Sequence, residues 1–321
     1  MSERVLVTGA AGFIGSHVSE ALVARGATVV GIDNFDPILY PRADKERNIA
    51  GLRAGVRFEF VEGDVARDPL PLDGCTAVIH LAAKAGVRPS LHDPGAYADT
   101  NVTATARVFD AARRAGVRRV VFGSSSSVYG DTTPPPFAED APAVEPVSPY
   151  AASKRAGELL AHACAPLYGL RIACLRFFTV YGPRQRPDLA IHTITALALR
   201  GAPVRMFGDG SSARDYTYIS DVVSGVLAAL EWTGRGEAGA RLFNIGGGAP
   251  LRLDRLIALI GEAVGRPITV ERHPDQPGDV RLTSADLRRA QRELGYQPQV
   301  AVAEGLEHFV RWYEEVHGRQ R

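Results

Sequence analysis

The chain has 321 residues, of which 45% are hydrophobic and 23% charged, with a formal net charge of +1. This composition is that of a globular protein large enough to bury a core, and the charge gives no basic field that would indicate nucleic-acid binding. No apolar run approaches the about 20 residues of a membrane-spanning helix, and a strand begins too early to leave room for a signal peptide. Cys75, Cys164 and Cys174 form neither a metal-ligand pattern nor a disulfide framework. We therefore expect a cytoplasmic protein without a metal site.

A glycine-rich turn follows the first predicted strand. The β-branched run Val5-Leu-Val7 leads into Thr8-Gly-Ala-Ala-Gly-Phe-Ile-Gly15, and a helical pattern covers residues 16–25. The backbone N–H groups and the dipole at the start of a helix favour an anion, and a strand, glycine turn and helix opening a βαβ unit are the setting of a dinucleotide site. The predicted cofactor contacts in this turn are Gly9, Gly12, Phe13, Ile14 and Gly15.

The second predicted strand, residues 28–32, ends in Asp33. A carboxylate about 20 residues beyond the glycine turn can accept both ribose hydroxyls of an adenosine and would repel a 2′-phosphate. Asn34 and Phe35 supply no arginine for such a phosphate, so the sequence favours NAD over NADP. Residues 34–55 are interpreted as polar and irregular.

Two further short strands, residues 57–61 and 77–81, have the turn-bounded form of buried parallel strands. His80, inside the second of them, is interpreted as a core histidine with satisfied hydrogen bonds. Open α/β sheets bind ligands at the carboxyl ends of their strands. The remaining predicted cofactor contacts, at such ends and near the start of a helix over 99–115, are Asn34, Asp64, Val65, Leu81, Ala82, Ala83, Asn101 and Ser124.

The fifth predicted strand, residues 119–122, runs into Gly123-Ser-Ser-Ser-Ser127. A proline-rich loop then leads to a helix over 150–167 that carries Tyr150 and Lys154, which are four residues apart and so share a face. A lysine ammonium near a phenol favours the phenolate, so Tyr150 can take up a proton near neutral pH. Lys154 is one of only three lysines in the chain, with Lys45 and Lys84.

The regular alternation of strands and helices breaks down after a sixth strand, residues 171–176. A helix over 221–231 and a strand over 242–245 are predicted to return to the first domain. The sequence thus predicts an α/β fold, a Rossmann-type doubly wound parallel sheet with a smaller, partly interleaved α/β domain. The predicted NAD-binding domain covers 1–177 and about 215–247, and the predicted second domain, which would bind the substrate, covers 178–214 and 248–321.

The glycine turn, Asp33, the serine turn and Tyr150-x-x-x-Lys154, in this order, resemble the extended short-chain dehydrogenase/reductase family in its NAD-dependent sugar-nucleotide epimerase branch. Within that branch, four segments are most similar to UDP-glucuronate 4-epimerases: Phe177-Phe-Thr-Val-Tyr-Gly-Pro183, Arg186-Pro-Asp-Leu-Ala190, Arg214-Asp-Tyr-Thr217 and Gln276-Pro-Gly-Asp279. The resemblance implies NAD as cofactor and a UDP-sugar as substrate. It also implies a homodimer that packs through the helices near 99–115 and 150–167.

The resemblance further implies the roles of individual residues. Ser125, three residues before Val-Tyr-Gly, would join Tyr150 and Lys154 as a catalytic group. Tyr150 would take the proton of the sugar 4-hydroxyl while NAD accepts and later returns the hydride, through a transient 4-keto sugar. Lys154 would hold the nicotinamide ribose and lower the pKa of Tyr150. The implied substrate contacts are Gly86, Arg88, Ser125, Ser126, Ser127, Tyr150, Thr179, Arg186, Val204 and Met206 beside the uracil, Arg214 at the diphosphate, and Gln276 and Asp279 near the uridine ribose.

The choice of substrate depends on an arginine. A glucuronate passes through a β-keto acid that loses carbon dioxide readily, so an epimerase has to hold its carboxylate out of line with the carbonyl π system. Arg186 with Thr179 is one candidate for this task, because a guanidinium grips a carboxylate bidentately, and Arg184 is a second.

Three other functions are alternatives. UDP-glucose 4-epimerase is the nearest. UDP-glucuronate decarboxylase is less favoured, because Ser126 and Ser127 stand where decarboxylases and the related 4,6-dehydratases have an acidic residue. A non-catalytic NAD-binding protein would be expected to have a broken set of Tyr, Lys and Ser, and here the set is intact.

Overall fold

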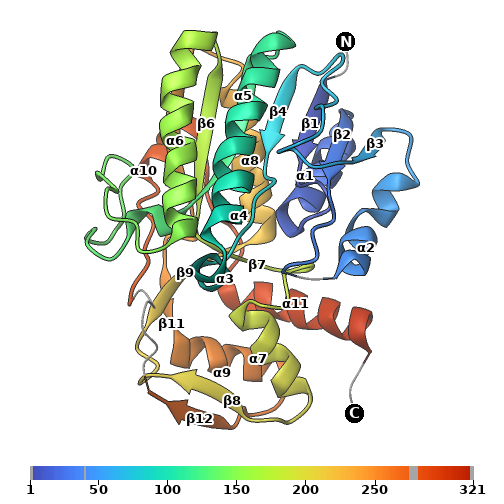
Figure 1. Ribbon diagram of the computed structural model, residues 1–321. Coiled ribbons are helices and arrows are strands. Elements are labelled where there is room, and N and C mark those ends of the chain that lie inside the picture. Colours follow the sequence, from blue (N-terminus) through green and yellow to red (C-terminus); the bar gives the residue numbers. More distant parts are fainter. Residues whose placement is uncertain (1–2, 40, 275–280, 319–321) are drawn as a thin grey trace.

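The computed structural model describes residues 3–39, 41–274 and 281–318, and its centre is a seven-stranded parallel sheet (Figure 1). The strand order is β10-β6-β5-β4-β1-β2-β3, so the direction of winding reverses between β1 and β4. Such a reversal leaves a crevice at the carboxyl ends of the two strands, where open α/β sheets bind ligands. The predicted Rossmann-type sheet is therefore confirmed. Its strands are β1 (Arg4–Thr8), β2 (Thr28–Asp33), β3 (Phe58–Glu62), β4 (Ala77–His80), β5 (Arg119–Ser125), β6 (Arg171–Phe177) and β10 (Gly239–Ile245).

Helices cover both faces of the sheet because its central strands are apolar on both sides. Val5 and Val7 pack into a core cluster with α1 and α8, whereas Leu6 between them packs into a second cluster with α5 and α6. In Figure 1, α5 and α6 lie side by side in front of the sheet. The first face carries α1 (Phe13–Ala24), α8 (Ile219–Trp232) and α10 (Arg288–Leu294); the second carries α3 (Val87–His92), α4 (Pro94–Ala98), α5 (Ala104–Arg114) and α6 (Pro149–Tyr168).

Local signals set the ends of α6. The Ser148 side chain accepts the N–H of Ala151, Pro149 occupies the first helical position, and Gly169 ends the helix in a left-handed conformation. Tyr150 and Lys154 therefore lie in the first turns of α6, near the carboxyl end of β5.

Three predicted elements differ from the structure. The segment interpreted as irregular contains helix α2 (Arg42–Arg53), whose only buried apolar side chains, Ile49 and Leu52, give too weak a helical pattern to detect. The helix predicted over 99–115 is α5 preceded by a π-helical turn (Asp99–Thr103). β5 continues to Ser125 because it stays paired with β6 up to Phe177, and a 3-10 turn (Ser126–Tyr129) follows it.

A smaller region lies below the large sheet in Figure 1 and has its own core, which includes Ile191, Leu256 and Phe309. As predicted, α8 and β10 return to the large sheet. The division of the chain into two domains stays a proposal, which these separate cores support. Across the described residues, none of the helices combines the length and apolar character required to span a bilayer. The smaller region contains β7 (Thr179–Tyr181), α7 (Ala190–Leu199), β8 (Val204–Phe207), β9 (Ala213–Tyr218), β11 (Pro250–Arg252), α9 (Leu253–Val264), β12 (Val270–His273) and α11 (Val302–His317).

Candidate active site

The glycine turn packs closely against the loop that follows β4. Gly9 has a φ of +69°, and a Cβ there would come within 2.8 Å of the Ala82 backbone nitrogen. A Cβ on Gly15 would overlap the carbonyl oxygen of Gly9. Gly12 is the N-cap of α1, and without a capping side chain the first N–H groups of this helix can bind an anion. The close backbone approach and the open helix N-terminus fit the pyrophosphate of NAD.

A cavity of about 490 Å³ opens at the carboxyl edge of the sheet, beside this turn. Its walls come from the segments that end or follow β1 to β6 and from the start of α6, so residues far apart in the sequence meet there. The predicted residues in these walls are Gly9, Gly12, Phe13, Ile14, Gly15, Asp33, Asn34, Asp64, Val65, Leu81, Ala82, Ala83, Gly86, Ser124, Ser125, Ser126, Ser127, Tyr150, Lys154, Thr179 and Arg186.

Other predicted substrate contacts lie away from these walls. Arg88 is exposed on α3, and the Val204 and Met206 side chains are buried in the core of the smaller region. Arg214 donates to the carbonyl of Ala213, at 3.1 Å, and does not line the cavity. None of these four side chains lines the cavity, and their contacts with the nucleotide sugar stay predictions. Gln276 and Asp279 lie outside the described residues.

Asp33 is fixed at the end of β2 by backbone N–H groups. Its Oδ2 accepts the N–H of Ala11 at 3.2 Å, and its Oδ1 accepts the N–H of Phe35 at 2.8 Å. Lys45, on the helix α2 that the sequence analysis missed, places its Nζ 3.4 Å from the same Oδ1. The carboxylate is therefore held in place next to the glycine turn, as ribose recognition requires.

A chain of hydrogen bonds runs through the buried His80. The Thr8 hydroxyl accepts the N–H groups of Leu81 and Ala82, so it donates its proton to Nδ1 of His80, at 2.7 Å. Nε2 then carries the ring proton and donates it to Thr105 Oγ1, at 3.1 Å. Burial lowers the pKa of His80 to about 3. His80 is thus a neutral core residue that supports the loop after β4, which confirms its interpretation.

Asn101 supports the same loop. Its Oδ1 accepts the N–H of Lys84 at 2.8 Å, and its Nδ2 donates to the carbonyl of Lys84 at 2.9 Å and to Ser153 Oγ at 2.9 Å. Asn101 is buried and lies behind the cavity wall. Asn101 was predicted as a cofactor contact, but its side chain forms hydrogen bonds with the backbone of Lys84.

Tyr150 forms part of the cavity wall, edge-on to Tyr97 with 6.3 Å between the ring centres. Burial raises the pKa of the Tyr150 phenol, while a hydrogen bond with Ser125 and the positive charge of Arg186 act to lower it. Ser125 Oγ also accepts the N–H of Ser127, at 3.2 Å, which fixes it at the end of β5. The phenol and the serine hydroxyl both line the cavity, and their part in proton transfer stays a prediction.

Lys154 has a different immediate partner from the expected one. Its Nζ donates to the carbonyl of Gly123 at 2.8 Å and lies 5.4 Å from the centre of the Phe122 ring. Burial lowers the pKa of Lys154 to about 8, and the Glu158 carboxylate opposes this shift. Because the ammonium is directed at β5, Arg186 is the cation that lowers the pKa of Tyr150 here. The lowering of the Tyr150 pKa by Lys154 stays a prediction.

A buried ion pair behind Lys154 was not predicted. Glu158 and Arg176 both have fully buried side chains, and two hydrogen bonds of 2.8 Å join their charged groups. Glu158 Oε1 also accepts the hydroxyl of Ser124 at 2.6 Å. The pair therefore fastens α6, which carries Tyr150 and Lys154, to the end of β5 and to β6. Its sequence signal is a glutamate four residues after Lys154, on the same helix face.

The two candidate arginines point to different places. Arg186 lines the cavity, and its Nε and Nη2 donate to the two carboxylate oxygens of Asp188 at 2.9 and 2.8 Å. Arg184 has a left-handed backbone, with a φ of +67°, and reaches α1, where it donates to Glu20 at 2.7 Å and Ser16 at 3.3 Å. Arg186 is therefore the better-placed candidate for a substrate carboxylate.

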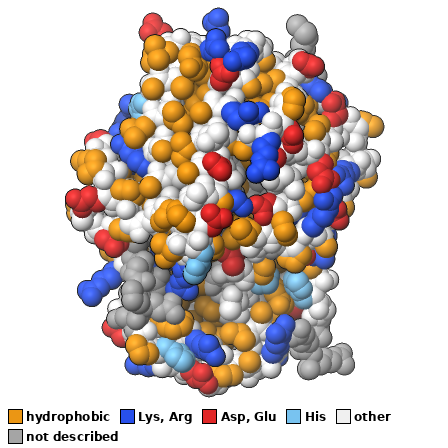
Figure 2. Space-filling view, in the orientation of Figure 1, with side chains coloured by type: hydrophobic (Ala, Val, Ile, Leu, Met, Phe, Trp, Pro, Cys, Tyr) orange, Lys and Arg blue, Asp and Glu red, His pale blue; other side chains and the backbone are white. Residues whose placement is uncertain are grey.

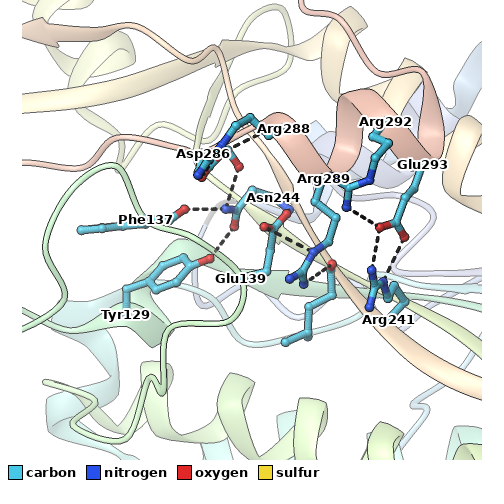
Figure 3. A network of polar contacts seen from close by, with 11 residues as sticks. Tyr129, Phe137, Glu139, Arg241, Asn244, Asp286, Arg288, Arg289, Arg292 and Glu293 are labelled. Atoms are coloured by element: carbon cyan, nitrogen blue, oxygen red, sulfur yellow. Dashed lines mark hydrogen bonds and ion pairs between the residues drawn. The ribbon is translucent and has the colours of Figure 1, made fainter.

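A polar network holds the proline-rich loop between the serine turn and α6 (Figure 3). Asn244 on β10 accepts the hydroxyl of Tyr129 at 2.7 Å and donates from Nδ2 to the carbonyl of Phe137 at 2.7 Å and of Asp286 at 3.1 Å. Its N–H is accepted by Glu139 at 2.9 Å. The loop is thus tied to the sheet, which restrains the segment that leads into Tyr150.

Comparison with known proteins agrees with this site. The model of the NAD dependent epimerase/dehydratase family matches residues 5–246. A UDP-glucuronate 4-epimerase of Thermodesulfobacterium geofontis is 37% identical over 97% of this chain and 96% of its own, and UDP-glucuronate 4-epimerase 4 of Arabidopsis thaliana is 41% identical over 96% of this chain and 75% of its own. The crystal structure of the UDP-glucuronic acid 4-epimerase from Bacillus cereus, in complex with UDP-glucuronic acid and NAD, superposes with a TM-score of 0.92 at 37% identity, covering 98% of this chain and 99% of that one. The chain belongs to the NAD dependent epimerase/dehydratase family.

Proposed function

We propose that the protein epimerises UDP-glucuronate to UDP-galacturonate at C4, through a transient 4-keto sugar. The observation that carries the proposal is the placement of Arg186 and Tyr150 in one cavity, with the Arg186 charge close enough to lower the pKa of the phenol. An anionic sugar fits such a site, because the guanidinium can pair with its carboxylate while the phenol faces its 4-hydroxyl. The relatives named as UDP-glucuronate 4-epimerases support the same substrate.

Individual residues have separate roles in the proposed reaction. Tyr150, in the same cavity wall as Ser125, takes the proton of the 4-hydroxyl and later returns it. Bound NAD supplies the hydride acceptor and donor at C4. Arg186, with Thr179 in the same cavity, holds the carboxylate so that its bond to the ring is not aligned with a 4-carbonyl, which suppresses loss of carbon dioxide. Asp188, two residues further along the chain, forms an ion pair with this guanidinium and so restrains it.

A product analysis tests this proposal. The NAD-loaded protein is incubated with UDP-glucuronate and the nucleotide sugars are separated. UDP-galacturonate is the expected product. UDP-xylose would make the protein a decarboxylase, and turnover of UDP-glucose without turnover of UDP-glucuronate would reassign the substrate.

Arg186→Ala is expected to raise the KM for UDP-glucuronate about 30-fold, the effect of losing a charge-assisted pair, and to change the KM for UDP-glucose much less. Steady-state kinetics with both sugars measure this difference. Arg184→Ala is the matched control, because it removes an arginine two residues away that binds Glu20 outside the cavity. Equal losses on the two sugars would refute the carboxylate role of Arg186.

We also propose a homodimer formed through α5 and α6. Figure 2 shows hydrophobic side chains gathered over these helices, and Leu159 and Leu167 on α6 are 55% and 78% exposed. A second copy would cover this face with its own α5 and α6 in a two-fold interface. Sedimentation at micromolar concentration is expected to give twice the 34.4 kDa chain mass, and Leu159→Glu with Leu167→Glu is expected to give the monomer. A native chain that sediments as a monomer would overturn the proposal.

We further propose that the protein is located in the cytoplasm. Cys75, Cys164 and Cys174 are free thiols, which suits a reducing compartment. Thiol titration of the unsubstituted protein, after denaturation without a reducing agent, should find three free thiols per chain.

A further inference from the structure

The three lysines of the chain all line the active-site cavity. Lys154 is part of the catalytic set and Lys45 lies beside Asp33, whereas Lys84 has no part in the chemistry proposed above. Lys84 follows β4, and its Nζ lies 2.5 Å from Oδ2 of Asp36, which follows β2. Both side chains are partly buried and both line the cavity.

The strand order shows which part of the site this ion pair spans. β4 and β2 are not neighbours, because β1 lies between them in the sheet. A contact between the loops after β4 and β2 therefore crosses the carboxyl end of β1, where the glycine turn lies. The glycine turn, Asp33 and both residues of the ion pair line one cavity, so a dinucleotide bound to the turn and to Asp33 would lie next to the ion pair.

Both ends of the ion pair are held in place. Asn101 binds the backbone N–H and carbonyl of Lys84 together. The N–H of Asp36 is accepted by Asn34 Oδ1 at 3.0 Å, and Asp36 Oδ1 accepts the N–H of Ile38 at 2.9 Å. Burial would raise the pKa of Asp36, but the hydrogen bond and charge of Lys84 hold it below its usual value. The ion pair is thus preorganised by contacts at both ends.

We propose that the Lys84–Asp36 ion pair is a clasp that closes over bound NAD and slows its release. The clasp rests on the proposed function in one respect: NAD is regenerated in every epimerisation cycle, so an epimerase works without exchanging its cofactor. The clasp has to open for NAD to leave, and the cost of breaking the pair adds to the barrier of release but not to the chemical step. The proposal concerns the cofactor alone and holds for either sugar substrate.

Release of NAD is measured without any UDP-sugar, so the result does not depend on the proposed substrate. Protein loaded with NAD is mixed with an excess of an unrelated NAD-dependent dehydrogenase and its substrate, which reduces each NAD as it leaves. Lys84→Met and Asp36→Asn are each expected to speed release about tenfold, the effect of losing one charge-assisted contact. The double variant should release NAD no faster than either single variant, because both remove the same pair.

Two further variants serve as a rescue and as a control in the release measurement. The exchanged pair, Lys84→Asp with Asp36→Lys, is expected to restore slow release in part. Glu59→Gln is the matched control: it removes an ion pair of 2.6 Å with Arg4 on the same sheet, outside the cavity, and should leave release unchanged. Thermal unfolding of the NAD-free variants checks that each one folds.

Two results would overturn the clasp. Native release rates in both single variants would show that the pair does not restrain NAD. Faster release in Lys84→Met together with unchanged or slower release in Asp36→Asn would show that Lys84 holds the cofactor phosphates directly and that Asp36 competes for it.

Discussion

Tyr150→Phe is expected to lower kcat for epimerisation about 10³-fold, within the range that removal of a positioned acid–base group produces. The phenol lies in the same cavity wall as Ser125, and phenylalanine keeps the ring and its edge-on contact with Tyr97. The substitution therefore removes proton transfer and leaves the shape of the site. Single-turnover kinetics on the NAD-loaded protein measure the step itself.

Tyr97→Phe is the matched control for this experiment. It also removes one phenolic hydroxyl, but that hydroxyl donates to the carbonyl of Ala85, at 2.7 Å, and supports the loop. Its effect on kcat should stay within about tenfold, because no proton of the reaction passes through it. If Tyr150→Phe retained a tenth or more of the native kcat, the mechanism proposed for Tyr150 would be wrong.

Glu158→Gln is expected to lower the free energy of unfolding by about 3 kcal/mol or more, because it leaves the Arg176 guanidinium buried without a counter-charge. Both side chains of the pair are fully buried. Glutamine has nearly the shape of glutamate, so the loss reports on charge and not on a cavity. Denaturant unfolding of the NAD-free protein measures it.

The same variant should change the response to acid. Burial by itself would raise the pKa of Glu158, but hydrogen bonds from Arg176, Ser124 and Arg155 hold it below its usual value. A carboxyl group with a lowered pKa in the folded state contributes stability above its unfolded pKa and loses it as the pH falls toward the folded pKa. The native protein should therefore lose stability below about pH 4.5 more steeply than Glu158→Gln.

Glu231→Gln provides the control for both measurements. Glu231 pairs with Arg25 at 3.0 Å, and both side chains are more than half exposed, so its loss should cost below about 1 kcal/mol. A loss of similar size in Glu158→Gln would contradict the structural role of the buried pair.

The features that sequence reasoning found are those that depend on neighbours in the chain. The glycine turn needs only the backbone freedom of Gly9 and the close approach at Gly15, and the start of α6 needs only Ser148 and Pro149. The helical spacing of Tyr150 and Lys154 is equally local. Helix α2 escaped detection because few of its side chains are apolar, so its period is hidden.

The partners of the charged groups could not be found in this way, because they lie far along the chain. Arg184 meets Ser16 across 168 positions, and Lys84 meets Asp36 across 48. The pattern of side chains also does not predict that Arg186 faces the cavity while Arg184, which has a left-handed backbone, binds Glu20. The pKa of Tyr150 likewise depends on a burial and a charge that only the assembled site supplies.

The sequence by itself determined the fold class, the preference for NAD and the predicted acid–base pair of this protein, because each follows from a short motif at a strand end or helix start. Only the tertiary structure decided that Arg186 lines the cavity. It also decided which charged groups pair: Glu158 with Arg176, and Lys84 with Asp36 across the end of β1. The physical reason is that the strand order brings distant loops to one edge of the sheet, where burial and charge set the chemistry.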